Sequence, residues 1–227
     1  MGGTFCAGAD LHEVARQDDI NVSPGKADKR GNSHFQALPE SAQPSLGHMC
    51  PSRLQMQKPV IGAISGYAVA GGLELSLLCD IRVVEENAVF MSTVHLQAIV
   101  GLGRALDMIL TGRPVGANEA LSMGLANRAV PKGKAVEEAM AIAKQLLSFP
   151  QLCMNVDRQS CYYSAYQASS FQDALRHEYE GGVRVLKTEN IKGAARFNCG
   201  ERRYGRFKHD PHIFKTRLSF LQLGCSA

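Results

Sequence analysis

A single carboxylate, Glu74, follows two adjacent glycines, Gly71 and Gly72, in a stretch that is otherwise almost entirely apolar. Glycine has no Cβ, so backbone N–H groups in such a turn can approach a bound group closely. The first turn of a helix also concentrates unpaired amides and the positive end of the helix dipole. The Gly71 amide could therefore hold a carbonyl oxygen that gains negative charge, with Glu74 beside it as a proton carrier. A close-packed corner between a strand and a helix fits the same residues, and the local pattern alone leaves both interpretations open.

A second motif lies near the N-terminus, in Phe5-Cys-Ala-Gly-Ala-Asp-Leu-His12. The pattern predicts the end of a short strand, a glycine turn and the start of a helix, where Asp10 caps or charges the first turn.

At the other end of the chain, His209 and His212 are three residues apart, but Pro211 lies between them. No cysteine or carboxylate is suitably spaced beside them, so we expect no metal site.

The elements that position these motifs are short. An apolar run at 60–65, closed by Gly66, predicts a strand covered on both faces, and two further strands are expected at 81–84 and 88–90. Helices are expected at 103–110, 118–123, 134–147 and 151–186, the last interrupted at Gly181-Gly182. The segment 16–57 is polar and without period, which predicts a long surface segment that is partly disordered. We therefore expect one α/β domain over 1–197 and a basic irregular tail over 198–227.

Composition excludes several classes of protein. A chain of 227 residues can bury a full core, and its net charge of +4, from 25 basic and 21 acidic residues, is too small to indicate a nucleic-acid or membrane-surface protein. The seven cysteines are scattered and form no C-x-x-C pair, which indicates reduced thiols in an intracellular compartment. No apolar run reaches the length of a membrane span, so we expect a soluble protein without a recognisable targeting signal.

Four blocks in order identify a resemblance. Phe5 to Leu11, Lys58 to Asp80, Leu110-Thr-Gly-Arg-Pro114 and Asn118 to Pro131 resemble the enoyl-CoA hydratase/isomerase (crotonase) superfamily. The resemblance covers roughly 3–11 and 58–197, except around 91–100. It implies a spiral of strand-strand-helix turns with a helical C-terminal region, and assembly as homotrimers or homohexamers. It also implies an acyl-CoA substrate, with no cofactor beyond the coenzyme A of that thioester.

The resemblance also implies roles for individual residues. Two backbone N–H groups of the family hold the thioester oxygen, and the matching positions here are Ala9 and Gly71, while Glu74 matches an acid/base carboxylate. Each family reaction passes through an enolate-like anion, which such donors stabilise. The residues expected to line the acyl-CoA site are Ala7, Ala9, Asp10, Leu11, His12, Gly71 and Gly72. A tight turn and a capped helix start would account for the same residues without any substrate.

The chain departs from the family pattern in three places. Val94 falls nearest the position of the second catalytic carboxylate, and valine cannot exchange protons. His95 is a conceivable replacement, although a surface or core histidine is the commoner reading. The loop after 91 is short, relatives have strands before the Phe5 block, and the tail is basic. These departures predict an incomplete or alternatively assembled family member that lacks N-terminal strands.

Three functions follow as hypotheses. The first is an acyl-CoA enzyme of the hydratase/isomerase type that uses Ala9, Gly71 and Glu74. Without a second carboxylate, isomerisation, decarboxylation or hydrolysis fits this site better than hydration. The second is a catalytically impaired scaffold that binds coenzyme A or forms an oligomer, which Val94 favours. The third, a nucleic-acid binder that uses the basic tail, predicts strongly salt-dependent affinity.

Overall fold

The computed structural model describes residues 3–10, 12, 56–91, 96–186 and 191. Contacts divide the chain into two units, Met1–Met140 and Ala141–Ala227, and each is described by itself. Of the long segment expected at 16–57, only residues 56 and 57 are described, and both are exposed and irregular. The tail expected at 198–227 lies outside the described residues. None of the helices that the structure describes combines the length and the apolar character that a membrane crossing requires.

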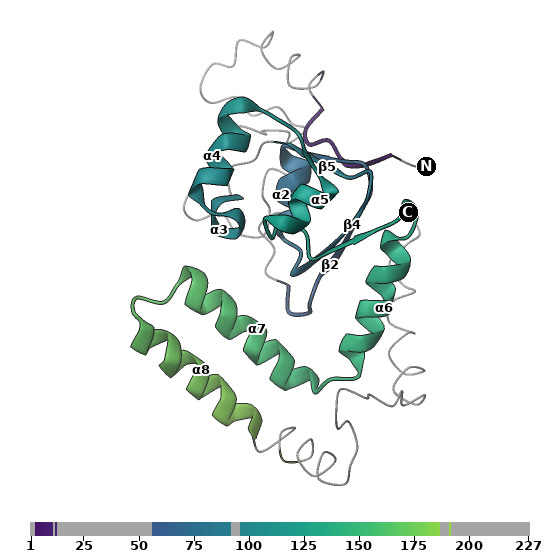
Figure 1. Ribbon diagram of the computed structural model, residues 1–227. Coiled ribbons are helices and arrows are strands. Elements are labelled where there is room, and N and C mark those ends of the chain that lie inside the picture. The colour runs from purple at the N-terminus through teal and green to yellow at the C-terminus, as the bar shows by residue number, and fades with distance from the viewer. Residues whose placement is uncertain (1–2, 11, 13–55, 92–95, 187–190, 192–227) are drawn as a thin grey trace, which may run out of the picture. The chain divides into compact units, whose positions relative to one another are not determined.

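The first unit contains two small sheets (Figure 1). One sheet has the order β1 (Thr4–Cys6), β3 (Tyr67–Val69), β5 (Val89–Met91) and β6 (Val115–Gly116), and its first three strands are parallel. The antiparallel neighbour of β5 is β6. The other sheet is entirely parallel, in the order β2 (Ile61–Ile64), β4 (Ile81–Glu85) and β7 (Arg128–Val130).

From β1 to β5, consecutive strands alternate between the two sheets, and helices follow β3 and β5. β2 and β3 lead into α2 (Gly71–Leu77), and β4 and β5 lead toward α3 (Gln97–Val100) and α4 (Leu102–Thr111). α5 (Ala117–Ser122) then connects β6 to β7. The expected strand-strand-helix turns are therefore confirmed. Strand β3 was not predicted, because only Ser65 and Gly66 separate it from β2, and Gly66 suggested a turn after the first strand.

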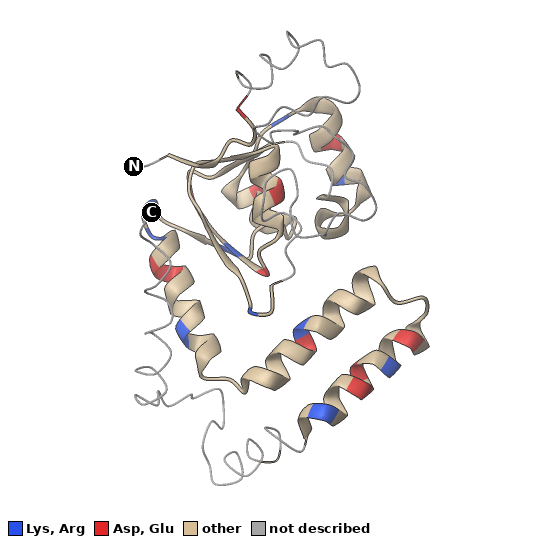
Figure 2. Ribbon diagram, turned by 180° about the vertical axis from the view of Figure 1, so that it is seen from behind, with Lys and Arg blue, Asp and Glu red and all other residues tan. Residues whose placement is uncertain are grey.

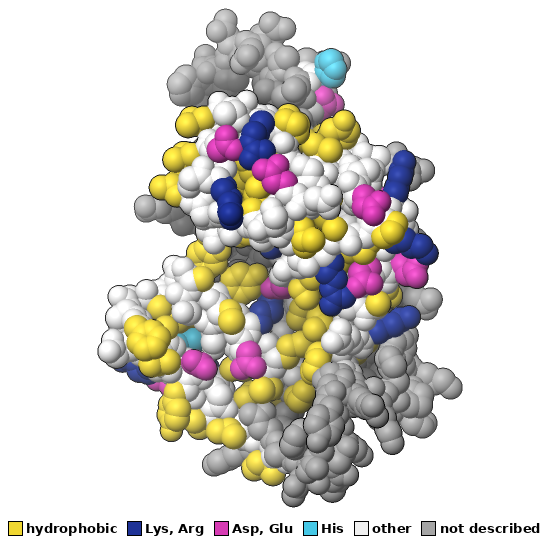
Figure 3. All heavy atoms as spheres, viewed as in Figure 1, with side chains coloured by type: hydrophobic (Ala, Val, Ile, Leu, Met, Phe, Trp, Pro, Cys, Tyr) yellow, Lys and Arg dark blue, Asp and Glu magenta, His cyan; other side chains and the backbone are white. Residues whose placement is uncertain are grey.

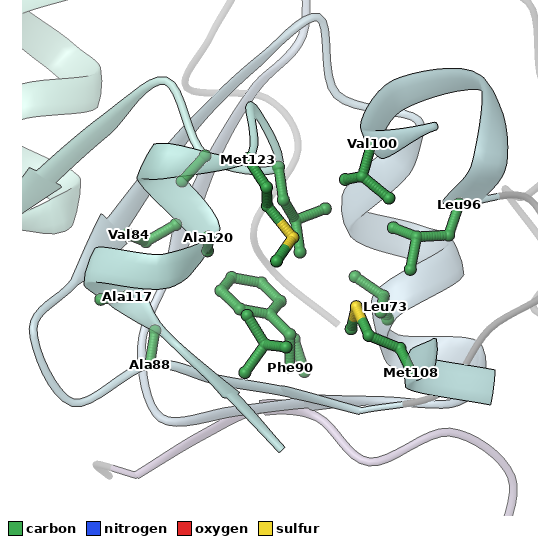
Figure 4. Close-up of a cluster of buried hydrophobic side chains, with 14 of the residues drawn as sticks. Leu73, Val84, Ala88, Phe90, Leu96, Val100, Met108, Ala117, Ala120 and Met123 are labelled. Atoms are coloured by element: carbon green, nitrogen blue, oxygen red, sulfur yellow. The ribbon is translucent and has the colours of Figure 1, made fainter. Parts of the chain in front are cut away.

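The helices close over a shared core (Figure 4). Phe90 on β5 is fully buried in a cluster with Leu73 of α2, Met108 of α4, and Leu96 and Met123, which flank α3 and α5. Burying such side chains contributes about 25 cal/mol for each Å² of apolar surface removed from water. This core joins β5 to α2, so it also supports the turn that carries the glycine pair.

One buried charged side chain, Arg82, makes hydrogen bonds to the backbone. Arg82 on β4 is 7% exposed, and its guanidinium donates to the carbonyl oxygens of Leu125 and Cys79, each at 2.6 Å. Its backbone N–H donates to Asn127 Oδ1 at 2.7 Å. A buried cation is tolerated when its donors are satisfied. Arg82 therefore ties β4 to the segment that precedes β7.

α6 (Ala135–Leu147) crosses the boundary at 140/141, and the second unit continues with α7 (Gln151–Tyr166) and α8 (Phe171–Val185). α7 packs along α8 as a pair (Figure 1), and charges of both signs follow α8 (Figure 2). The continuous helix predicted over 151–186 is wrong. The chain turns at 167–170 because the Ser170 side chain accepts a hydrogen bond from the Asp173 N–H and caps α8.

The interruption predicted at Gly181-Gly182 is also wrong, because both glycines lie inside α8. A Cβ on Gly181 would lie 2.8 Å from Val156 Cγ1 on α7. Gly181 is therefore a packing glycine that lets the two helices approach closely.

Candidate functional site

The two motifs meet at the carboxyl ends of neighbouring parallel strands. β1 pairs with β3, with Cys6 opposite Ala68. Residues 7–10 continue from the end of β1, while Ala70 and α2 continue from the end of β3. Parallel neighbours end at the same edge of a sheet, so the loops that follow them lie side by side. The N-terminal motif and the glycine pair are thus brought together although some sixty residues separate them in the chain.

Gly8 touches the turn that opens α2. A Cβ built on Gly8 would lie 3.1 Å from the Gly71 amide nitrogen and 3.3 Å from the Val69 carbonyl oxygen. The φ angle of Gly8 is +84°, which side chains other than glycine rarely adopt. The backbone of the Gly8 turn therefore lies close to the backbone that leads into α2. Ala9, the other predicted amide donor, directly follows Gly8.

Gly72 makes the second close approach. A Cβ at this position would lie 2.5 Å from the Cys6 carbonyl carbon and 2.9 Å from Cys6 Cβ, and closer still to the Cys6 oxygen. Real Cβ atoms do not occur at such distances, so only glycine fits without movement of β1 or α2. Gly72 is thus a place where two backbones approach, as in the close-packed corner that the sequence left open, and the glycine pair begins the helix rather than preceding it.

Glu74 lies on the first turn of α2 and is half-buried. Residues three apart share a face of a helix, so Glu74 lies on the same face as Gly71. Its N–H donates to the Ala70 carbonyl oxygen at 3.1 Å, which makes the first hydrogen bond of the helix. A helix leaves its first amides without intrahelical partners, and Gly71 is the first residue of α2. Glu74 and Gly71 therefore lie on one face at the start of α2, and their role in a site stays a prediction.

Ala70 is a feature of the site that the sequence did not indicate. It precedes α2 with φ 49° and ψ −119°, and it has the only positive φ among the non-glycine residues that the structure describes. Its N–H donates to the Met91 carbonyl oxygen at the end of β5, at 3.1 Å. The only local signal for this conformation was that an alanine directly precedes a glycine pair at a strand-to-helix turn.

The remaining predicted residues are exposed or lie outside the described part. Ala7, Ala9, Asp10 and His12 are exposed, and the His12 N–H donates to Asp10 Oδ1 at 2.9 Å, so Asp10 does cap the turn. Leu11, Val94, His95, His209 and His212 lie outside the described residues. No group of three potential metal ligands occurs among the residues that the structure describes.

The thiol of Cys79, which follows α2, is not suited to act as a nucleophile. Burial raises the pKa of Cys79, against a lowering by the neighbouring Arg82 charge. A buried thiol with a raised pKa stays protonated at neutral pH and is a poor nucleophile. The arrangement is therefore that of two adjoining backbone turns and one carboxylate, which can polarise a carbonyl group and move a proton.

Comparisons with known proteins agree with this description. A family model described as enoyl-CoA hydratase/isomerase matches residues 1–192. The chain is 43% identical over 207 residues to a Thermus thermophilus protein provisionally assigned as an enoyl-CoA hydratase, covering 86% of this chain and 76% of that one. It is 29% identical over 220 residues to the short-chain-enoyl-CoA hydratase of Clostridium acetobutylicum, covering 91% of this chain and 77% of the relative.

A solved structure has the same fold. The crystal structure of an enoyl-CoA hydratase from Bacillus anthracis superimposes with a TM-score of 0.68 at 26% identity, covering 87% of this chain and 75% of that chain. The chain thus spans about three quarters of the length of each of these three proteins.

Proposed function

Because the chain belongs to the enoyl-CoA hydratase/isomerase family, we propose that it processes acyl-CoA thioesters through an enolate-like anion. The observation that carries this proposal is the contact between the Gly8 turn and the Gly71 amide. That contact brings the neighbourhood of Ala9 beside Gly71, as two donors to one oxygen require. The fold of the family and the half-buried Glu74 support the same assignment.

The chemistry follows from the charge that develops on the thioester oxygen. When a base removes a proton from the carbon next to the carbonyl group, the electron pair moves into the C=O bond and the oxygen becomes negative. The N–H groups of Ala9 and Gly71 donate to that oxygen, and the start of α2 favours negative charge there. Losing one such donor typically lowers kcat by about 10²- to 10³-fold.

Glu74 is the proposed proton carrier. It lies one helical turn from Gly71, on the same face of α2, and it is the only charged residue of that helix. Hydration of a double bond needs a positioned acid and a positioned base, and the position of the second carboxylate falls near Val94. Reactions that use one base, such as isomerisation, therefore fit these residues better than two-carboxylate hydration.

The direct test is turnover of short- and medium-chain enoyl-CoAs by the wild-type protein and by Glu74→Gln. We expect Glu74→Gln to lose about 10²-fold or more of the activity, because glutamine keeps the shape but cannot carry a proton. Glu86→Gln is the matched control, since Glu86 is exposed in the turn between β4 and β5. Equal turnover by wild type and Glu74→Gln would remove Glu74 from the mechanism.

A second function is a catalytically impaired scaffold that binds coenzyme A or forms an oligomer. Val94, at the place of a proton-transferring residue, favours it. Titration calorimetry with acetyl-CoA separates the two functions when it is combined with the turnover assay. Binding without turnover supports the scaffold, whereas binding with turnover that depends on Glu74 supports the enzyme.

We also propose that the chain assembles as a homotrimer or homohexamer. α4 exposes leucines at four-residue spacing, Leu102, Leu106 and Leu110, which are 64%, 42% and 79% exposed. Hydrophobic side chains lie on the surface over α4 (Figure 3), and such a stripe is typical of an interaction face. Sedimentation velocity of the wild type and of a Leu110→Lys variant tests this, because the variant should dissociate toward monomers.

A further inference from the structure

Ala70 has a backbone conformation that glycine normally provides. Its φ of 49° and ψ of −119° match the first central position of a type II′ turn. A side chain at this position is strained, and such residues persist only where the surrounding structure holds them. Ala70 makes two backbone hydrogen bonds, and its methyl group lies close to Gly8.

Two backbone hydrogen bonds hold the two peptides on either side of Ala70. The Ala70 N–H donates to the Met91 carbonyl oxygen, and the Ala70 carbonyl oxygen accepts from the Glu74 N–H, each at 3.1 Å. The peptide that joins Ala70 to Gly71 is trans, so its C=O and N–H bonds point in opposite directions. Because the carbonyl group points along α2 to Glu74, the Gly71 N–H must point out of the start of the helix.

The methyl group of Ala70 lies against the Gly8 turn. A Cβ built on Gly8 would lie 3.4 Å from Ala70 Cβ, so the methyl group borders the space beside Gly8. The Ala70 methyl group therefore limits the space next to the segment that carries the other proposed donor. Glycine at position 70 would remove the strain, but it would also open this space and widen the range of accessible φ and ψ angles.

We propose that Ala70 is a positioning residue that aims the Gly71 amide and sets its distance from the Gly8–Ala9 turn, at a cost in stability. The inference rests on the proposed function, because the amide has to be aimed only if it receives a thioester oxygen. It predicts that stability and activity change in opposite directions when the Ala70 methyl group is removed.

The experiment compares Ala70→Gly, Ala70→Ser and the wild type by steady-state kinetics on enoyl-CoA and by thermal unfolding. For Ala70→Gly we expect kcat to fall about tenfold with little change in KM, because a looser donor loses transition-state stabilisation. Its Tm should rise by about 2–4 °C as the strain is released. Ala70→Ser keeps a Cβ, so its kcat and Tm should stay near those of the wild type.

Ala141→Gly is the matched control, because Ala141 is exposed on α6 and carries no proposed role. It should lower Tm by about 2–4 °C and leave kcat unchanged. Two outcomes would overturn this inference but not the proposed function. One is that the wild type is active and Ala70→Gly is equally active, and the other is that Ala70→Gly has no higher Tm than the wild type. A wild-type protein that turns over no acyl-CoA would overturn the proposed function, and this inference with it.

Discussion

Replacing Gly72 by alanine should separate β1 from α2 and disable the site. The added Cβ would lie 2.5 Å from the carbonyl carbon of Cys6, whereas carbon atoms in contact are about 3.5 Å apart. The two backbones must therefore move apart by about 1 Å or more, and neither is a flexible side-chain end that could give way. Overpacking of this kind typically costs about 1–3 kcal/mol. Because Cys6 leads directly to Gly8 and Ala9, the same movement displaces one proposed donor from the other.

The matched control is Gly103→Ala on α4. Gly72 and Gly103 both lie in helices, but a Cβ on Gly103 would meet nothing within 4 Å. Alanine is a better helix former than glycine by about 0.8–1.0 kcal/mol. The same chemical change should therefore stabilise the protein at position 103 and destabilise it at position 72.

Thermal or urea unfolding measures the first effect, and enoyl-CoA turnover by the folded fraction measures the second. We expect Gly72→Ala to lower the free energy of unfolding by about 1–3 kcal/mol and kcat by about 10²-fold, since a misplacement of about 1 Å costs that much. Gly103→Ala should keep its activity. A Gly72→Ala protein as stable as Gly103→Ala, with wild-type turnover, would refute the close approach of β1 and α2 and the site built on it.

Three further predictions concern the core and the α7–α8 pair. Phe90→Ala should lower the free energy of unfolding by about 3–5 kcal/mol, because Phe90 is fully buried in the shared core; a loss below about 1 kcal/mol in urea unfolding would contradict that position. Gly181→Ala should lower Tm through its contact with Val156, and Val156→Ala should restore part of the loss in a double-mutant cycle; additive effects would contradict the packing of α7 on α8. The Ser169 N–H lowers the pKa of Asp173. The stability from Asp173 is therefore present above its unfolded pKa of about 3.9 and is lost as the pH falls through the lower folded value. The Tm difference between wild type and Asp173→Asn should narrow from about pH 6 to about pH 3, and a constant difference would contradict this role.

Local features of the site could be predicted from the sequence because they depend on neighbouring residues. The order glycine, glycine, leucine, glutamate placed Glu74 in the first turn of a helix, and the structure confirms it. Asp10 at the turn after β1 was predicted in the same way. The alternation of strands and helices was read from apolar runs, whose existence is easier to predict than their exact ends.

Features that depend on distant residues could not be predicted from local pattern. The contact of Gly8 with Gly71 requires the parallel pairing of β1 with β3, and nothing within either segment specifies that pairing. Only the family resemblance linked the two motifs. The strained conformation of Ala70 depends on the Met91 carbonyl oxygen, about twenty residues further along the chain.

The second unit shows how a pair of glycines can mislead a helix prediction. Gly181 and Gly182 suggested an interruption because glycine lowers helix propensity, but the close packing of α7 on α8 overrides that preference. The true boundary at 167–170 has a signal of its own, Ser170 followed three residues later by Asp173.

Exchange of the hydrogens on the carbon next to the thioester carbonyl tests the central claim most directly, because it needs only the anion-stabilising amides and one base. Butanoyl-CoA would be incubated with the protein in D₂O, and deuterium incorporation would be followed by mass spectrometry. We expect the wild type to catalyse the exchange and Glu74→Gln to lose about 10²-fold or more of the rate, with Glu86→Gln unchanged. Exchange no faster than in buffer, or equal exchange by wild type and Glu74→Gln, would contradict the assignment of Ala9, Gly71 and Glu74 as an enolate-stabilising site.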